Sequence, residues 1–185
     1  MCIRDSPNLI IVAPRNEVEL RNIMYTAQLG LEHPIAIRYP RGRGVLTEWQ
    51  KPFEKIKIGS SKELKKGTKV AVLSIGTIGN TVSNVINEIG TLDEIGHYDM
   101  RYAKPLDTNR LSKIFKTYKH IITIEDGCKS GGFGSAVLEF ANETKTTIPI
   151  HIMGIDDDFI PHGTCLLYTS PSPRDLSTSR MPSSA

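Results

Sequence analysis

The 185-residue sequence lacks the features that mark membrane proteins and nucleic-acid-binding proteins. No apolar run approaches the roughly 20 residues that a helix needs to span a bilayer, and no basic and apolar leader precedes the first apolar segment. The formal net charge is +3, without a lysine-rich block or aromatic residues interleaved with basic ones. We therefore expect partners that are neither membranes nor nucleic acids.

Cysteine is also scarce. The three cysteines, Cys2, Cys128 and Cys165, have spacings that fit neither a metal site nor a disulfide framework, which favours a reducing cytoplasm. Four of the five histidines are weighed as metal ligands: His97, His120, His151 and His162. Each stands singly, without a second histidine two or four positions away, and this argues against a zinc site.

The composition changes at both ends of the chain. Residues 165–185 are rich in Ser, Pro and Thr and have almost no apolar periodicity, so burial cannot offset the entropy of ordering them. This tail and residues 1–6 resemble translated sequencing adapters; the alternative is a natural disordered tail with Ser-Pro phosphorylation sites. We expect native sequence from Pro7 to Thr164, cut at both ends, with disordered segments outside it that do not contribute to function.

Between these ends, apolar strands alternate with helical patterns. A strand-helix-strand unit comes first (7–48) and is too small to stand alone. A longer series follows the linker at 49–52, and its alternation predicts an α/β domain with a doubly wound, mostly parallel sheet over 49–164. Its expected strands are 70–76, 97–100, 121–125 and 148–153, its helices 77–92, 108–118 and 131–144, and its edge ribbon 56–67. In the first helix, Val82, Val85, Ile86 and Ile89 are expected to face inward.

The expected strand 35–39 ends in Arg38-Tyr39-Pro40-Arg41-Gly42. Open α/β sheets place anion sites at the carboxyl ends of their strands, and arginine carries a permanently charged fork that matches phosphate oxygens two at a time. The segment is therefore a candidate anion site. The alternative is a basic loop that is paired with carboxylates at the surface.

Two further motifs have structural alternatives. The glycine-rich stretch 131–135 precedes a helix, as a phosphate loop would, but it lacks the order of a dinucleotide loop or a P-loop. We favour the alternative that its glycines allow the helix start to pack tightly on the sheet. Glu125-Asp126-Gly127 invites comparison with the Gly-Asp-Gly metal motif, but its first residue differs and a helix-entry turn is favoured. Cys128 is interpreted as a loop thiol.

Taken together, six stretches resemble the 1-deoxy-D-xylulose-5-phosphate synthases, a family of transketolase-type thiamine diphosphate enzymes. They are APRNE at 13–17, RYPRG at 38–42, YDMRYAKPLD at 98–107, EDG at 125–127, GGFGS at 131–135 and FIPHG at 159–163. The resemblance covers residues 7–164. It implies the end of a pyrimidine-binding domain (7–48) followed by a transketolase-type C-terminal domain (49–164).

The resemblance also implies a function. Enzymes of this family join pyruvate to glyceraldehyde 3-phosphate with loss of carbon dioxide, for isoprenoid, thiamine and pyridoxal synthesis, and use thiamine diphosphate and Mg²⁺. The parent would be a cytoplasmic homodimer. Arg38 would bind the acceptor phosphate, and Tyr39 and Arg41 would support the loop. The family's catalytic, cofactor and metal residues precede the matched region, so we expect none here and an inactive fragment.

Two other functions are weighed against this one. One is a non-catalytic binding or assembly domain of the same fold. The other is a fragment of a 2-oxo acid dehydrogenase β subunit; those proteins share the KPLD and GGFG stretches but lack RYPRG. The resemblance assigns no role to Glu125, Asp126, Cys128 or His162.

Overall fold

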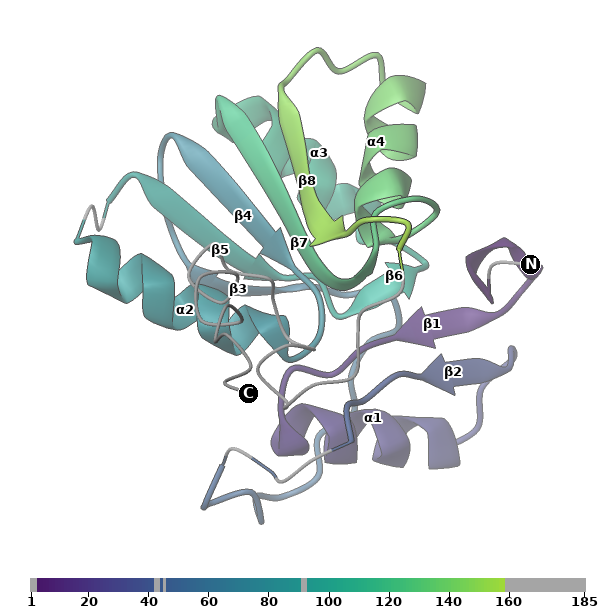
Figure 1. Cartoon of the computed structure of the whole chain (residues 1–185). Helices are drawn as coiled ribbons and strands as arrows, with labels where there is room; N and C mark the ends of the chain where they lie inside the picture. Colours follow the sequence, from purple (N-terminus) through teal and green to yellow (C-terminus); the bar gives the residue numbers. More distant parts are fainter. Residues whose placement is uncertain (1–2, 42–43, 45, 91–92, 159–185) are drawn as a thin grey trace, which may run out of the picture.

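The computed structural model describes residues 3–41, 44, 46–90 and 93–158. A three-stranded sheet and a five-stranded sheet lie next to each other, joined by chain crossings between them (Figure 1). The first elements are a 3-10 turn (Ile3–Asp5), β1 (Ile10–Val12), α1 (Glu17–Gln28) and β2 (Ile35–Ile37). β1 and β2 pair in parallel, as the strand-helix-strand pattern predicted.

The larger sheet has the strand order β3-β5-β4-β7-β8. Its strands are β3 (Lys62–Lys65), β4 (Val70–Ser74), β5 (Ile95–Asp99), β7 (His120–Cys128) and β8 (Ile150–Ile155). All neighbouring pairs are parallel except β3 with β5, which is antiparallel at the edge. The predicted doubly wound, mostly parallel sheet is therefore confirmed.

Helices cover both faces of this sheet, because each strand sends alternate residues to opposite sides. On one face, α2 (Ile78–Ile89) packs Val82 and Ile86 against Val72 of β4. On the other, α3 (Thr108–Thr117) and α4 (Phe133–Glu143) enclose a core that contains Leu73, Leu111, Ile114, Phe133 and Val137.

The inward face of α2 is narrower than the sequence pattern suggested. Val82 and Ile86 are buried, but Val85 is 45% exposed and Ile89 is 54% exposed. The expectation that all four face inward was wrong for these two residues. Apolar spacing marks a helix face but does not show how far the sheet extends under it.

A short strand that the sequence did not reveal joins the two sheets. β6 (Tyr102–Lys104) pairs antiparallel with β1, in the order β2-β1-β6, with Val12 opposite Tyr102. Val12 and Tyr102 are fully buried, and both belong to one apolar cluster with Ile23 and Ile56. The first strand-helix-strand unit therefore has a sheet partner in the later part of the chain.

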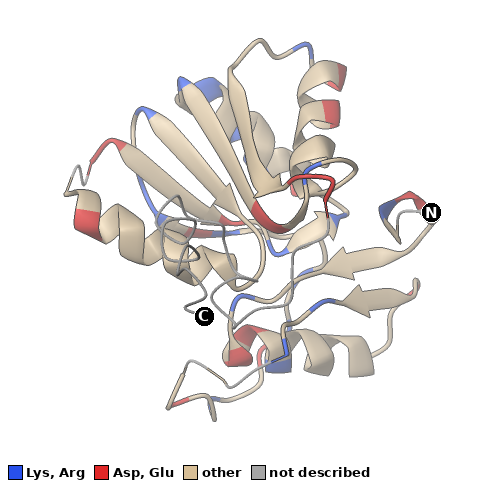
Figure 2. Cartoon of the chain, in the orientation of Figure 1, with Lys and Arg blue, Asp and Glu red and all other residues tan. Residues whose placement is uncertain are grey.

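The structure also corrects the expected disorder of residues 3–6. They form a 3-10 turn, and Lys104 Nζ donates to the carbonyl oxygens of Arg4 and Ser6, at 3.1 and 2.7 Å. Residues 165–185 lie outside the described residues. In the described part of the chain, no helix is long and apolar enough to cross a membrane. Basic and acidic residues lie mainly on the helices, at the ends of strands and in the connecting segments, whereas β1, β2, β4 and β8 carry none (Figure 2).

Candidate functional site

Arg38 lies directly after β2, at the edge where parallel strands end. Its backbone N–H donates to the carbonyl of Val12 at 2.8 Å, so the residue is fixed to the end of β1 although it is no longer part of the strand. Its side chain is 57% exposed. The sequence therefore placed this guanidinium correctly at a strand end.

The partner of Arg38 is Asp126 of β7. Arg38 Nη1 pairs with the Oδ1 carboxylate oxygen of Asp126, and Arg38 Nη2 donates to the main-chain oxygen of the same residue at 2.9 Å. The two residues are 88 positions apart in sequence, and the contact joins the end of β2 to the C-terminal part of β7. Of the two sequence interpretations, the carboxylate-paired loop is thus present in the structure, with a cation that remains accessible to solvent.

The next three residues of the RYPRG segment, 39–41, are exposed as well. The Tyr39 side chain is 62% exposed, and Arg41 is exposed as well. Gly42 lies outside the described residues. The supporting role expected of Tyr39 and Arg41 stays a prediction.

Two concave regions meet at Arg38. A cavity of about 570 Å³ opens on one side, with Arg38 and Glu125 among its polar lining and Ile11, Ile37 and Phe133 among its apolar lining. A hollow of about 40 Å³ lies on the other side and is lined by Ala13, Pro14, Arg38, Tyr39, Pro40, Gly76, Thr77 and Asp126. The cavity is thus mostly apolar with three charged residues in its lining, Arg4, Arg38 and Glu125, and a mostly apolar lining with a few polar groups is usual for a small-molecule site.

Glu125 lies inside β7, so the expected helix-entry turn at 125–127 was wrong. Its carboxylate nevertheless serves the helix start, because Phe133 N–H donates to Oε2 at 2.9 Å and Gly134 N–H donates to Oε1 at 2.8 Å. Burial raises the pKa of Glu125, and these two hydrogen bonds oppose the rise. A carboxylate of the chain itself therefore occupies the helix N-terminus where a bound phosphate would otherwise sit.

The glycines at this helix start are required by packing, as the sequence analysis favoured. A Cβ atom on Gly132 would lie 2.4 Å from Glu125 Oε2, and one on Gly134 would lie 2.6 Å from Ile152 Cγ2. Both distances are far below a van der Waals contact. The packing interpretation of the glycine-rich stretch is confirmed.

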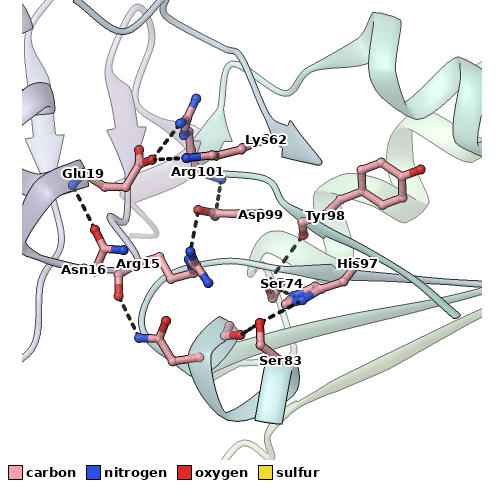
Figure 3. A network of polar contacts seen from close by, with 12 residues as sticks. Arg15, Asn16, Glu19, Lys62, Ser74, Ser83, His97, Tyr98, Asp99 and Arg101 are labelled. Atoms are coloured by element: carbon pink, nitrogen blue, oxygen red, sulfur yellow. Dashed lines mark hydrogen bonds and ion pairs between the residues drawn. The ribbon is translucent and has the colours of Figure 1, made fainter. Parts of the chain in front are cut away.

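A second group of polar side chains connects the two sheets (Figure 3). The Arg101 guanidinium donates to Glu19 Oε1 at 2.7 Å, and Lys62 Nζ lies 3.5 Å from the same oxygen. The buried carboxylate of Asp99 lies 3.9 Å from Arg15 Nε. Burial raises the pKa of Asp99 to about 6. These residues hold α1 against the ends of β3 and β5.

Sequence reasoning missed a buried histidine next to this network. His97 Nε2 is hydrogen-bonded to Ser74 Oγ at 2.8 Å, and its Nδ1 is hydrogen-bonded to Ser83 Oγ at 3.2 Å (Figure 3). Burial lowers the pKa of His97 to about 4. Ser74 and His97 are 0% and 1% exposed, so this pair cannot meet a substrate and is structural. Its position inside an apolar strand was the signal available in the sequence.

The remaining candidates are not brought together. Cys128 is a half-buried free thiol at the end of β7 rather than in a loop, and His162 lies outside the described residues. Among the residues that the structure describes, no group of three or more His, Cys, Asp or Glu residues could hold a metal ion.

Comparison with known proteins identifies the family. Residues 59–173 match the family described as Transketolase, C-terminal domain. The chain belongs to this family. The predicted resemblance to 1-deoxy-D-xylulose-5-phosphate synthases is likewise confirmed by its relatives.

Two curated relatives show how far the similarity extends. The 1-deoxy-D-xylulose-5-phosphate synthase of Bacteroides thetaiotaomicron is 49% identical over 166 residues, which are 88% of this chain and 25% of that protein. The synthase of Cytophaga hutchinsonii is 49% identical over 160 residues, which are 85% of this chain and 25% of that protein. The chain therefore spans about a quarter of the length of these relatives.

A solved structure shares the arrangement of the chain. It is described as a split gene transketolase, inactive beta4 tetramer, and it matches with a TM-score of 0.78 at 25% identity. The match covers 96% of this chain and 57% of that one. The transketolase-like α/β fold thus includes the first strand-helix-strand unit as well as the larger sheet.

Proposed function

We propose that this chain forms the C-terminal quarter of a 1-deoxy-D-xylulose-5-phosphate synthase, an enzyme that condenses pyruvate with glyceraldehyde 3-phosphate and releases carbon dioxide. The observation that carries the proposal is the 49% identity to the Bacteroides thetaiotaomicron synthase over 88% of the chain. The 2-oxo acid dehydrogenase alternative has no comparable support, because the curated relatives described above are synthases.

Within this function, Arg38 is the residue that we propose for binding the phosphate of the acceptor. The support is its place at the carboxyl end of a parallel strand, its exposed guanidinium and the cavity beside it. A guanidinium can donate to two phosphate oxygens at once, which fixes the orientation of the acceptor as well as its position. Tyr39 and Arg41 remain proposed as supports of the loop.

Thiamine diphosphate and Mg²⁺ are the cofactors that we propose for the whole enzyme, where the thiamine would hold the acyl group derived from pyruvate. The described residues do not fit the metal, since no cluster of ligands is present among them. We therefore place both cofactors on other parts of the enzyme and expect this chain alone to be inactive.

We also propose a cytoplasmic homodimer for the parent enzyme. The similar split gene transketolase is described as an inactive tetramer, so a related chain can assemble without activity. The same observation favours a second candidate function, a non-catalytic assembly domain of this fold.

A chimera separates the two functions. Residues 7–164 of this chain would replace the aligned segment of the Bacteroides thetaiotaomicron synthase, followed by that enzyme's own C-terminal residues. We expect product formation from pyruvate and glyceraldehyde 3-phosphate within about tenfold of the intact relative, because half of the residues are identical. The isolated chain should form no product. A folded, dimeric chimera without activity would support the assembly domain instead.

A further inference from the structure

Asp126 contacts Arg38 in two ways that differ in how easily they can be released. The main-chain oxygen belongs to β7, whose position the sheet fixes, and it accepts from Arg38 Nη2 at 2.9 Å. The carboxylate oxygen belongs to a side chain that is 22% exposed and can rotate toward solvent. One contact therefore holds the guanidinium in place, and the other can be exchanged.

The surroundings keep the main-chain contact in place. The preceding residue, Glu125, is bound through its carboxylate to two backbone N–H groups of α4, so this part of β7 cannot shift freely. On the other side of the pair, the hollow of about 40 Å³ has room for little more than a few water molecules. An anion larger than water gains full access to Arg38 when the Asp126 carboxylate turns away.

We infer that the Asp126 carboxylate competes with other anions for Arg38. It thereby sets a threshold, which is the affinity that an anion needs in order to bind there. The main-chain oxygen of Asp126 positions the guanidinium of Arg38. The Asp126 carboxylate stays paired with this guanidinium until an anion that binds it more tightly takes its place. This inference rests on the proposed function, in which Arg38 receives the acceptor phosphate. Asp126 thus lowers the affinity of that site for every competing anion by the same factor.

The reason for such a threshold lies in the two proposed substrates. Pyruvate carries a carboxylate with one negative charge, whereas the acceptor carries a phosphate with about 1.5 to 2 charges at pH 7. An anion that binds Arg38 Nη1 competes with the Asp126 carboxylate, so its apparent affinity falls by the fraction of time that this nitrogen is free. At a given concentration, an anion that binds weakly, such as a carboxylate, then fails to replace Asp126 at Arg38, whereas a phosphate still binds.

The test uses the whole chain and two simple probes, inorganic phosphate and acetate, at constant ionic strength. Binding is followed by the NMR signal of the Arg38 Nε–H group, which is assigned by its loss in Arg38→Lys. Asp126→Asn keeps the main-chain contact and removes the carboxylate charge. Because surface ion pairs contribute up to about 1 kcal/mol, we expect phosphate to bind three- to fivefold more tightly in this variant. Acetate should bind more tightly by the same factor.

The controls separate this inference from the proposed function. Asp156→Asn removes the same charge from another surface pair, with Lys129, and should change neither affinity. Asp126→Ala should behave like Asp126→Asn. Weaker or unchanged phosphate binding in both Asp126 variants, with clear binding at Arg38 in the unmodified chain, would overturn the threshold alone. If phosphate perturbs Arg38 neither in the unmodified chain nor in the two variants, the proposed phosphate role fails, and the threshold fails with it.

Discussion

Arg101 Nη2 donates to Glu19 Oε1 at 2.7 Å across 82 positions of the chain. Both side chains are largely buried, at 13% and 8% exposure, and the contact fastens α1 to the turn between β5 and β6. Together with the pairing of β1 and β6, this ion pair makes the first strand-helix-strand unit part of the same folded body as the larger sheet. The candidate anion site depends on this attachment, because Arg38 and Asp126 come from the two different sheets.

The first prediction concerns this buried pair. Glu19→Gln and Arg101→Gln should each lower the free energy of unfolding by up to about 3 to 5 kcal/mol, because each removes the hydrogen-bonded partner of a buried charge. In the double variant, the loss of unfolding free energy should be at least about 1 kcal/mol smaller than the sum of the losses in the two single variants. Urea denaturation of the four proteins measures this coupling. Glu94→Gln, which breaks the exposed pair with Lys69, should cost less than about 1 kcal/mol.

The second prediction is a pH dependence that arises from His97. Its pKa is lowered from 6.5 to about 4 in the folded chain, so the unfolded chain binds a proton that the folded chain does not. The contribution of His97 to the free energy of unfolding should therefore fall by about 3 kcal/mol as the pH drops from above 6.5 to 4. Equilibrium denaturation at a series of pH values checks this slope.

A difference between variants isolates the contribution of His97. The raised pKa of Asp99, about 6, acts in the opposite direction, since stability is lost as the pH rises toward that value. We therefore compare the unmodified chain with His97→Gln, in which the loss between pH 6.5 and 4 should be smaller. Equal slopes in the unmodified chain and His97→Gln would contradict the assignment.

The third prediction concerns the cap of α3. Asp107 accepts from Arg110 N–H at 3.0 Å and from both the N–H and the hydroxyl of Ser61, at 2.8 and 2.7 Å. Burial alone would raise the pKa of Asp107, but these hydrogen bonds outweigh it and hold the pKa below its ordinary value. Asp107→Ala should lower the free energy of unfolding by about 1 to 2 kcal/mol. Asp156→Asn is the control for loss of charge and should have almost no effect.

Local signals predicted much of the fold. The apolar run at 70–76 contains the central strand β4 (Val70–Ser74), and Asp107, directly before α3, is the N-cap of that helix. These features depend on residues that are close together in sequence. The carboxyl-end position of Arg38 was predictable for the same reason.

Long-range contacts were not predictable in this way. β6 has three residues and no apolar alternation, and it becomes a strand because β1 lies beside it. Likewise, the Asp126 side chain meets Arg38 because the ends of β2 and β7 lie together, and no local pattern at 125–127 indicates this. The sequence was compatible with a free anion site and with a loop paired to a carboxylate. The structure shows that Arg38 is paired with Asp126.

The most direct test of the account is the effect of Arg38→Ala in the chimeric synthase on kcat/KM for glyceraldehyde 3-phosphate. A charge-assisted contact of this kind contributes about 1.5 to 3 kcal/mol, so we predict a roughly ten- to hundredfold loss. Unphosphorylated glyceraldehyde should be almost unaffected, and Arg38→Lys should recover part of the loss. Arg41→Ala should lower stability more than it lowers acceptor affinity. Equal losses for phosphorylated and unphosphorylated acceptors would contradict the account and leave Arg38 as the structural partner of Asp126.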